Sequence, residues 1–341
     1  MTTDAPLHPS LALLDDGEVP PDLPVCDHYC GVETRMRKSL QLQAELGPVF
    51  DVTLDGEDGA PVGGEVEHAH LMAELVDSSL NAHGRVGARV VPVDHPAFVP
   101  MLEALLPRAG ARLAYLMIPK PNGVADLGTA VAAVDRISAS TGLQRTIPLH
   151  ALVETHGALR EVHALAAHPR IESLSFGLMD FVSAHRGAIP QSAMGVQGQF
   201  EHPLVLRAKL EISAACHGHA KVPSHCVVTE FKDRSAVQAA AERASRQLGY
   251  TRMWSIHPDQ ILPIVDAFAP SAAEVDQAIE IITAAHAAHW APIRHSHHGR
   301  EQLHDRASFR YFWQVLQRAH RTSVANGPQL PAEIRLAFFD L

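Results

Sequence analysis

Three carboxylates follow an apolar run near residue 50. The run VFDVTL, residues 49–54, leads directly into Asp55, Glu57 and Asp58 within the stretch LDGEDGAP. Carboxylates this close repel one another and raise one another's pKa, so folding alone gives little reason to cluster them. The three acids therefore lie either in a solvated turn or beside something positively charged that is bound there.

Two more carboxylates end later apolar runs. Glu154 lies at the end of HALVET, and Asp180 follows SFGLM. Mg²⁺ is commonly bound by one or two carboxylates, with waters and substrate oxygens as the other ligands. We interpret Glu154 and Asp180 as such a pair. The structural alternative is that Asp180 caps the helix that follows it and that Glu154 pairs with a nearby arginine.

Basic side chains and a histidine occupy comparable positions. Arg89 lies inside ARVVPV, where a charge is costly unless it is paired, so it either clamps a substrate carboxylate or pairs with the acids after residue 54, and both can hold at once. Lys120, in IPKPNG, could form a Schiff base with a carbonyl substrate, although its flanking prolines favour a rigid turn with an ion-pairing lysine. His257, in SIHPDQI, is expected to shape its loop.

Eight short apolar runs, each followed by turn residues and then a helical pattern, predict the elements that carry these side chains. They span residues 27–32, 49–54, 88–93, 113–118, 148–153, 171–179, 225–231 and 253–256. Such alternation predicts a (β/α)8 barrel, in which the loops after the strands form the catalytic face. The charged residues would then converge on one mouth. No G-x-G-x-x-G follows the first strand, which disfavours a dinucleotide-binding fold.

The chain of 341 residues is expected to comprise a flexible lead (1–24), a catalytic barrel (25–268) and a C-terminal helical extension (269–341). Its formal net charge of -10 argues against nucleic-acid binding, and no apolar run is long enough to span a bilayer. The N-terminal residues do not resemble a secretory signal, and four cysteines suit a reducing compartment. We therefore expect a cytoplasmic protein that acts on a small-molecule substrate and binds neither nucleic acid nor membrane.

Two clusters have the residue types of a metal site. Cys26, His28 and Cys30 are spaced so that all three lie on one face of a strand, and the HSHHG segment, with His295, His297 and His298, is typical of a flexible surface loop. The cysteine cluster has no second ligand pair for zinc. We favour structural roles for both clusters.

Six stretches follow one another along the chain: LDGEDGAP, ARVVPV, IPKP, ALVETHGAL, FGLMDF and SIHPDQI. In this order and at barrel spacing they resemble the HpcH/HpaI aldolase and citrate lyase family. The resemblance is greatest to its branch of citrate lyase β-subunit-like proteins, with malyl-CoA and citramalyl-CoA lyases. It covers residues 27–265 and implies a Mg²⁺-dependent carbon–carbon lyase on a (β/α)8 barrel.

The resemblance also implies roles for single residues. Glu154 and Asp180 match the metal-binding carboxylates of the family, and Arg89 matches its substrate-carboxylate arginine. Asp55 and Glu57 match the acidic pair of its L-D-x-E-D motif, which lies beside the reacting carbons and handles protons. Asp55, Glu57 and Asp58 would thus crowd together because the site needs negative charge beside a cation.

Further substrate contacts are expected from Arg35 and Arg37, in ETRMRKS, and from Lys120. Relatives of this branch form trimers or hexamers, which implies a homo-oligomer. They also often take a catalytic aspartate from a Gly/Met-containing C-terminal motif of a neighbouring subunit. That motif is missing here, and Asp305 is the candidate in its place.

Three functions are compatible with these residues. The leading one is Mg²⁺-dependent cleavage of a 3-hydroxyacyl-CoA of the malyl-, citramalyl- or citryl-CoA type into an acyl-CoA and a 2-oxo acid. A second is a metal-dependent aldolase that joins free 2-oxo acids and an aldehyde. A third is a non-catalytic subunit that binds a 2-oxo acid or acyl group, which the missing C-terminal motif supports.

Overall fold

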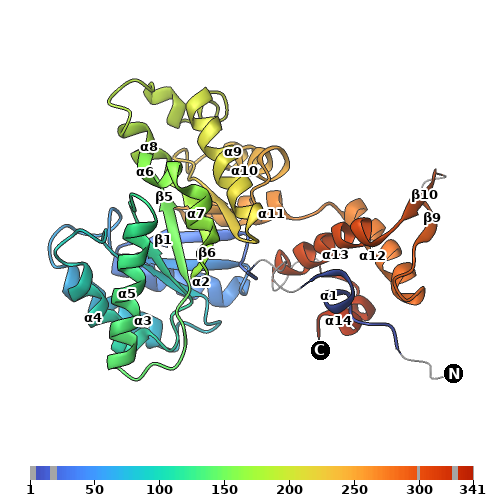
Figure 1. Ribbon diagram of the computed structural model, residues 1–341, viewed down its shortest axis with the longest axis horizontal. Helices are drawn as coiled ribbons and strands as arrows, with labels where there is room; N and C mark the ends of the chain where they lie inside the picture. Colours follow the sequence, from blue (N-terminus) through green and yellow to red (C-terminus); the bar gives the residue numbers. More distant parts are fainter. Residues whose placement is uncertain (1–4, 16–20, 298–299, 325–328, 341) are drawn as a thin grey trace. The chain divides into compact units, whose positions relative to one another are not determined.

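The computed structural model describes residues 5–15, 21–297, 300–324 and 329–340. The chain divides into two compact units (Figure 1). One unit is Pro20–Ala267, and the other combines Met1–Val19 with Phe268–Leu341. The charged residues expected at the strand ends all lie in the first of these, whereas Asp305, the candidate for a C-terminal acid, lies in the other.

The first unit is a closed barrel of eight parallel strands in chain order, because β1 pairs with both β2 and β8. The strands are β1 (Cys26–Cys30), β2 (Phe50–Asp55), β3 (Val86–Arg89), β4 (Leu116–Ile118), β5 (Leu149–Val153), β6 (Ile171–Phe176), β7 (Val222–His225) and β8 (Arg252–Ser255). The predicted (β/α)8 barrel is therefore confirmed.

Helices connect successive strands and surround the barrel (Figure 1). They are α2 (Glu33–Leu46), α3 (Glu65–Asp77), α4 (Phe98–Ala109), α5 (Val124–Ser140), α6 (His156–Arg160), α7 (Val162–Ala167), α8 (Leu178–Ser183), α9 (Pro203–Gly218), α10 (Arg234–Leu248) and α11 (Ile261–Phe268), with 3-10 turns η1 (Gln191–Met194), η2 (Gly198–Phe200) and η3 (Pro258–Gln260). Their ends follow local chemistry. In α10, for example, the Asp233 side chain accepts a hydrogen bond from the Ala236 amide, and Gly249 ends the helix with a φ of 71°.

Four predicted strands differ from the observed ones by three or more residues at one end, among them β4, which covers 116–118 instead of 113–118. β3 covers residues 86–89 instead of 88–93, β7 covers 222–225 instead of 225–231, and the run 171–179 splits into β6 and the start of α8. The pairing register explains β7, because Val222 lies opposite Ser173 of β6 and Ser224 lies opposite Arg252 of β8. Neighbouring strands thus set the bounds of β7, and the more apolar residues that follow it lie in the loop.

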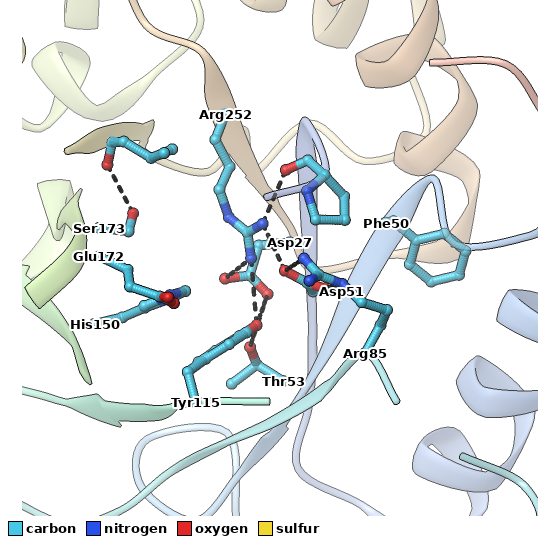
Figure 2. A network of polar contacts seen from close by, with 12 residues as sticks. Asp27, Phe50, Asp51, Thr53, Arg85, Tyr115, His150, Glu172, Ser173 and Arg252 are labelled. Carbon is cyan, nitrogen blue, oxygen red and sulfur yellow. Dashed lines mark hydrogen bonds and ion pairs between the residues drawn. The ribbon is translucent and has the colours of Figure 1, made fainter. Parts of the chain in front are cut away.

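A buried ionic network fills part of the barrel interior (Figure 2). The Arg252 guanidinium lies 3.0 Å from an Asp27 carboxylate oxygen and 2.6 Å from one of Asp51, and it also donates a hydrogen bond to the Pro24 carbonyl. All three charged side chains are fully buried. Arg85 forms a further ion pair with Asp51 at 2.8 Å. Barrel interiors are usually packed with branched apolar residues, so this network is a distinctive feature of the chain.

An apolar layer follows this network along the strands. Tyr29, Met117, Leu152 and Trp254 form a cluster of buried side chains, and the Tyr29 and Trp254 rings stack with centroids 4.4 Å apart. Tyr29 and Trp254 come two residues after Asp27 and Arg252 on the same strands, so they point to the same side of the sheet one layer further on. The residues at the strand ends lie beyond this layer.

The second unit has its own apolar core. Its elements are α1 (Pro9–Leu13), α12 (Ala272–Ala287), β9 (Ile293–His297), β10 (Arg300–His304), α13 (Arg306–Arg321) and α14 (Ala332–Phe338). Leu13 is buried among residues of α12 and α13, and the Trp290 indole N–H donates a hydrogen bond to the Leu7 carbonyl. Residues 7–13, expected within a flexible lead, therefore pack as part of this unit. Of the helices in the described ranges, none has the length and apolar character needed to cross a membrane.

Candidate active site

The charged residues predicted at the strand ends lie together. Side-chain contacts and electrostatic interactions connect residues that follow or end five successive strands, β2 to β6. They are Asp55, Glu57, Asp58, Arg89, Lys120, Glu154 and Asp180. We call this set the mouth cluster.

Asp55 and Arg89 form the base of the mouth cluster. Arg89 donates from Nε and Nη2 to the two carboxylate oxygens of Asp55, at 2.7 and 2.5 Å. The Asp55 carboxylate also accepts hydrogen bonds from the backbone amides of Glu57 and Gly59, which fixes the loop after β2. Burial by itself would lower the pKa of Arg89, but the Asp55 carboxylate outweighs it and raises that pKa, so the guanidinium stays charged.

Glu57 lies between the two cations of the mouth cluster. One of its carboxylate oxygens lies 2.8 Å from Arg89 Nη1, and the other accepts a hydrogen bond from Lys120 Nζ. Burial raises the pKa of the Glu57 carboxyl, whereas the charges of Arg89 and Lys120 act in the opposite direction. Glu57 is thus a buried carboxyl that is held by ion pairs yet accepts a proton more readily than an exposed glutamate does.

The ammonium group of Lys120 is the second cation of the mouth cluster. It contacts Glu57, lies 2.9 Å from Asp58 and lies 3.8 Å from Asp180. Burial alone would lower the pKa of Lys120, but the hydrogen bonds to Glu57 and Asp58 raise it. A lysine that forms a Schiff base must be available as the neutral amine. The structure therefore argues against the Schiff-base alternative and favours the ion-pairing one.

Glu154, which directly follows β5, is a buried acid of the mouth cluster. One of its oxygens accepts a hydrogen bond from the Lys120 amide at 2.8 Å, and its side chain packs against Gly177, where an added Cβ would lie 2.2 Å from the other oxygen. Burial and the charges of Asp180 and Glu57 raise the pKa of Glu154 to about 8. Asp180 lies in the first turn of α8 without a side-chain capping bond, and its side chain is 42% exposed.

A divalent cation fits the chemistry of this donor set. Within the described residues, no group of three or more His, Cys, Asp or Glu side chains has a metal-binding arrangement. Mg²⁺, however, needs only one or two carboxylates when water and substrate supply the remaining oxygens. The buried Glu154 carboxyl is unfavourable as an anion beside Asp180 and Glu57, and a cation would relieve that cost. Glu154 and Asp180 are the residues that could hold it.

Three other predicted residues lie away from these contacts. Arg37 forms ion pairs with Glu33 and Glu74 on the helix surface, at 2.8 and 3.3 Å, and Arg35 is exposed on the first turns of α2. His257 accepts a hydrogen bond from the Asp259 amide and stacks on Phe231 with ring centroids 4.8 Å apart. These contacts agree with a loop-shaping role for His257.

The two clusters that resembled metal sites have structural contacts. Cys26 and Cys30 are buried free thiols, and His28 shares a hydrogen bond with Ser255 of β8 at 2.9 Å. Burial lowers the pKa of His28 to about 4. In the HSHHG segment, the His295 ring lies 3.1 Å from Glu280, while His298 lies outside the described residues.

Sequence reasoning did not single out several residues around the cluster. The Arg89 guanidinium lies 5.5 Å from the centre of the Tyr29 ring, and Gly59 and Gly177 leave room for the side chains of Asp55 and Glu154. Tyr29 could have been found from the alternation in DHYCG, which points Asp27 and Tyr29 to one face. The close approach of the glycines depends on tertiary packing and leaves no local signal.

Comparisons with known proteins agree on one family. A family model described as HpcH/HpaI aldolase/citrate lyase matches residues 49–258. The crystal structure of a citrate lyase from Burkholderia xenovorans LB400 is 51% identical, covers 97% of this chain and all of its own, and superposes with a TM-score of 0.82. An L-malyl-CoA/beta-methylmalyl-CoA lyase of Cereibacter sphaeroides is 27% identical over 250 residues, 70% of this chain and 77% of that protein.

A more distant structure shares the fold. The protein CitE from Mycobacterium tuberculosis, in complex with magnesium, acetoacetate and coenzyme A, is 20% identical. It covers 87% of this chain and 98% of its own, with a TM-score of 0.64. The barrel and the family resemblance read from the sequence are both confirmed.

Proposed function

Because the chain belongs to the HpcH/HpaI aldolase/citrate lyase family and is therefore a carbon–carbon lyase, we propose that it uses Mg²⁺ to cleave a 3-hydroxyacyl-CoA of the malyl-, citramalyl- or citryl-CoA type into an acyl-CoA and a 2-oxo acid. The malyl-CoA lyase relative supports the thioester substrate. The magnesium and coenzyme A bound by the more distant CitE are consistent with both parts of the proposal.

One observation of the site carries the proposal. Glu154 is a buried carboxyl at the end of β5, and its nearest charged neighbours include two further acids, Asp180 and Glu57. Folding gains nothing from placing a carboxylate in such surroundings. A site that binds a divalent cation requires this concentration of negative charge.

When bound by Glu154 and Asp180, the cation would polarise the 2-oxygen of the substrate and stabilise negative charge that develops there. The protein side chains would do the rest. Arg89 uses three of its five N–H groups in the contacts with Asp55 and Glu57, so two remain for a substrate carboxylate. Asp55 would act as the positioning residue that holds the guanidinium in place.

Glu57 is the better candidate for proton transfer. Cleavage requires a base that removes the hydroxyl proton before the carbon–carbon bond breaks, and an acid that returns a proton to the carbon of the leaving acyl group. Asp55 already accepts hydrogen bonds from Arg89 and from two backbone amides, which makes it a weak base. Burial raises the pKa of Glu57, which favours proton exchange. We therefore assign proton transfer to Glu57. Asp55 is assigned the positioning of the Arg89 guanidinium.

The test is mass spectrometry of malyl-, citramalyl- and citryl-CoA, each incubated with the protein in the presence of Mg²⁺ or excess chelator. Loss of one thioester with its 2-oxo acid appearing, prevented by the chelator, would establish the lyase and its substrate. Release of free CoA without carbon–carbon cleavage would replace the proposed reaction by thioester hydrolysis. No turnover of any thioester would direct the search to free 2-oxo acids with an aldehyde.

A second experiment tests the Lys120 alternative. Borohydride traps a Schiff base between a lysine and a carbonyl substrate as a stable secondary amine. Because Lys120 stays protonated among Glu57, Asp58 and Asp180, we expect no adduct with pyruvate by intact-mass measurement. An adduct on Lys120 that forms in excess chelator would contradict the metal-dependent mechanism.

The family resemblance further supports a cytoplasmic homo-oligomer, either a trimer or a hexamer. Asp305, the candidate for a C-terminal acid, caps α13 by accepting hydrogen bonds from the Ala307 and Ser308 amides. That role accounts for Asp305 without a catalytic function. Light scattering of the purified protein would test the assembly, and a monomer would count against it.

A further inference from the structure

The Lys120 ammonium group takes the place of a cation in the mouth cluster. It contacts Glu57 and lies 2.9 Å from Asp58 and 3.8 Å from Asp180. Asp180 is one of the two residues proposed to hold a divalent cation. The lysine and a bound cation would therefore draw on the same negative charge.

The backbone holds Lys120 in this position. Lys120 has a φ of 50°, in the left-handed region that residues other than glycine seldom adopt. In this conformation its amide donates to Glu154, the other proposed metal carboxylate, while its side chain reaches Glu57 and Asp58. Strained backbone of this kind persists only where surrounding contacts determine it, and it clusters at functional sites. The prolines on both sides restrict the alternatives further.

The charges of the cluster do not balance. Its five carboxyl groups, those of Asp55, Glu57, Asp58, Glu154 and Asp180, outnumber its two cations, Arg89 and Lys120. Arg89 is taken up by Asp55 and Glu57, so Lys120 is the cation nearest to the Glu154 and Asp180 side of the cluster. A divalent cation that enters there meets attraction from the acids and repulsion from this ammonium group.

We propose that Lys120 is a built-in counter-ion that weakens divalent-cation binding to the free protein and makes it depend on an anionic substrate. The inference deepens the proposed function and rests on its metal site. The carboxylate of a 2-oxo acid brings a negative charge that offsets the repulsion between Lys120 and the cation. Cation and substrate would then bind cooperatively, each strengthening the other by the same factor. Lys120 would be a positioning and coupling residue, not a nucleophile.

Calorimetric titration with Mg²⁺, with and without pyruvate as the probe anion, tests the inference. The variant Lys120→Met removes the charge but keeps an unbranched side chain. We expect it to bind Mg²⁺ at least about tenfold more tightly than the unmodified protein without pyruvate, and pyruvate to enhance its Mg²⁺ affinity less. Lys120→Arg keeps the charge and should retain weak, pyruvate-dependent binding. Lys38→Met, at an exposed position of α2, is the matched control and should change neither value.

The outcomes separate this inference from the proposed function. Unchanged or weaker Mg²⁺ binding in Lys120→Met, in a protein that binds Mg²⁺ otherwise, would overturn only the role of Lys120. An absence of Mg²⁺ binding in every form, with and without pyruvate, would overturn the metal site and this inference together. Tighter binding in Lys120→Met would support the inference even if no thioester were cleaved. If Lys120→Met fails to fold, Lys120→Gln provides the same charge removal.

Discussion

Asp55 and Arg89 are register partners across β2 and β3, and their side chains join in a two-bond ion pair beyond the ends of those strands. The pair is buried, and its carboxylate also orders the loop that carries Glu57. Backbone register and side-chain contact therefore fix the same geometry. Two alternatives for Arg89, a structural ion pair and a substrate clamp, are compatible because the guanidinium has N–H groups left over.

Removing Arg89 alone should destabilise the protein. Arg89→Met leaves the buried Asp55 carboxylate without its cation, which costs about 3–5 kcal/mol of unfolding free energy in comparable buried pairs. The double variant Asp55→Asn/Arg89→Met should recover part of this loss, because no uncompensated charge remains, while activity stays absent. Urea denaturation measures the first effect and the thioester assay the second. Equal stability of the single and double variants would contradict the pairing.

Gly177→Ala should damage the site through Glu154. The added Cβ would lie 2.2 Å from one Glu154 carboxylate oxygen and 2.5 Å from its Cβ, so the Glu154 side chain must move. Misplacing a catalytic group by about 1 Å can cost roughly a hundredfold in rate. Gly128→Ala is the matched control, since nothing lies within 4 Å of its added Cβ in α5, and we expect a gain of about 0.5–1 kcal/mol in stability. Unaltered activity in Gly177→Ala would count against a role of Glu154 in the reaction.

Loss of either proposed metal carboxylate should abolish the response to Mg²⁺. A ligand that binds only the folded state raises the melting temperature, so the unmodified protein should melt higher with Mg²⁺ and pyruvate than with chelator. Glu154→Gln and Asp180→Asn should lose that difference. Asp259→Asn, an exposed acid of η3, should keep it. A retained Mg²⁺ shift in both Glu154→Gln and Asp180→Asn would place the cation elsewhere.

Lys209, a buried residue outside the mouth cluster, is expected to make folding stability depend on pH. Its buried ammonium group donates a hydrogen bond to Gln199 at 2.8 Å and lies 4.0 Å from the centre of the Phe200 ring. Burial lowers the pKa of Lys209 from 10.5 to about 8. Between these values the unfolded chain binds more protons than the folded one, so folding stability rises with pH in that window.

Lys209→Met should lack this rise. From pH 7 to pH 11, we expect the unfolding free energy of the unmodified protein to gain roughly 3 kcal/mol relative to the variant. Denaturant midpoints of both proteins at each pH measure the difference, and titrating groups that do not interact with Lys209 cancel in the comparison. A difference between the two proteins that does not change with pH would show that Lys209 is not the responsible group.

Arg37 and Arg35 are expected to differ in their effect on substrate binding. Arg37 is bound by Glu33 and Glu74 on the exposed face of α2, where ion pairs contribute about 0–1 kcal/mol. Arg37→Ala should therefore leave the thioester KM within about twofold of the unmodified value. If Arg35 contacts the substrate, Arg35→Ala should raise KM without a comparable fall in kcat, as expected for a contact equal in ground and transition states. A rise in KM in Arg37→Ala but not in Arg35→Ala would instead assign the substrate contact to Arg37.

The sequence by itself determined the barrel and most of the mouth cluster. Strand and helix periods predict a parallel barrel, and in such a fold every residue that follows a strand faces the same end. Asp55, Glu57, Arg89, Lys120, Glu154 and Asp180 could therefore be grouped before any contact was known. Strand bounds were less predictable, because pairing with neighbours, as in β7, outweighs the local preference of an apolar run.

Only the tertiary structure decided how those charges are shared. It brings Arg252 of β8 between Asp27 and Asp51 of β1 and β2, a contact that depends on closure of the barrel and that no local pattern encodes (Figure 2). It likewise places Lys120 among the acids of other strands. Local sequence fixes which side chains of a strand point to the same face, whereas the partner of a charge depends on distant segments that meet only in the folded chain.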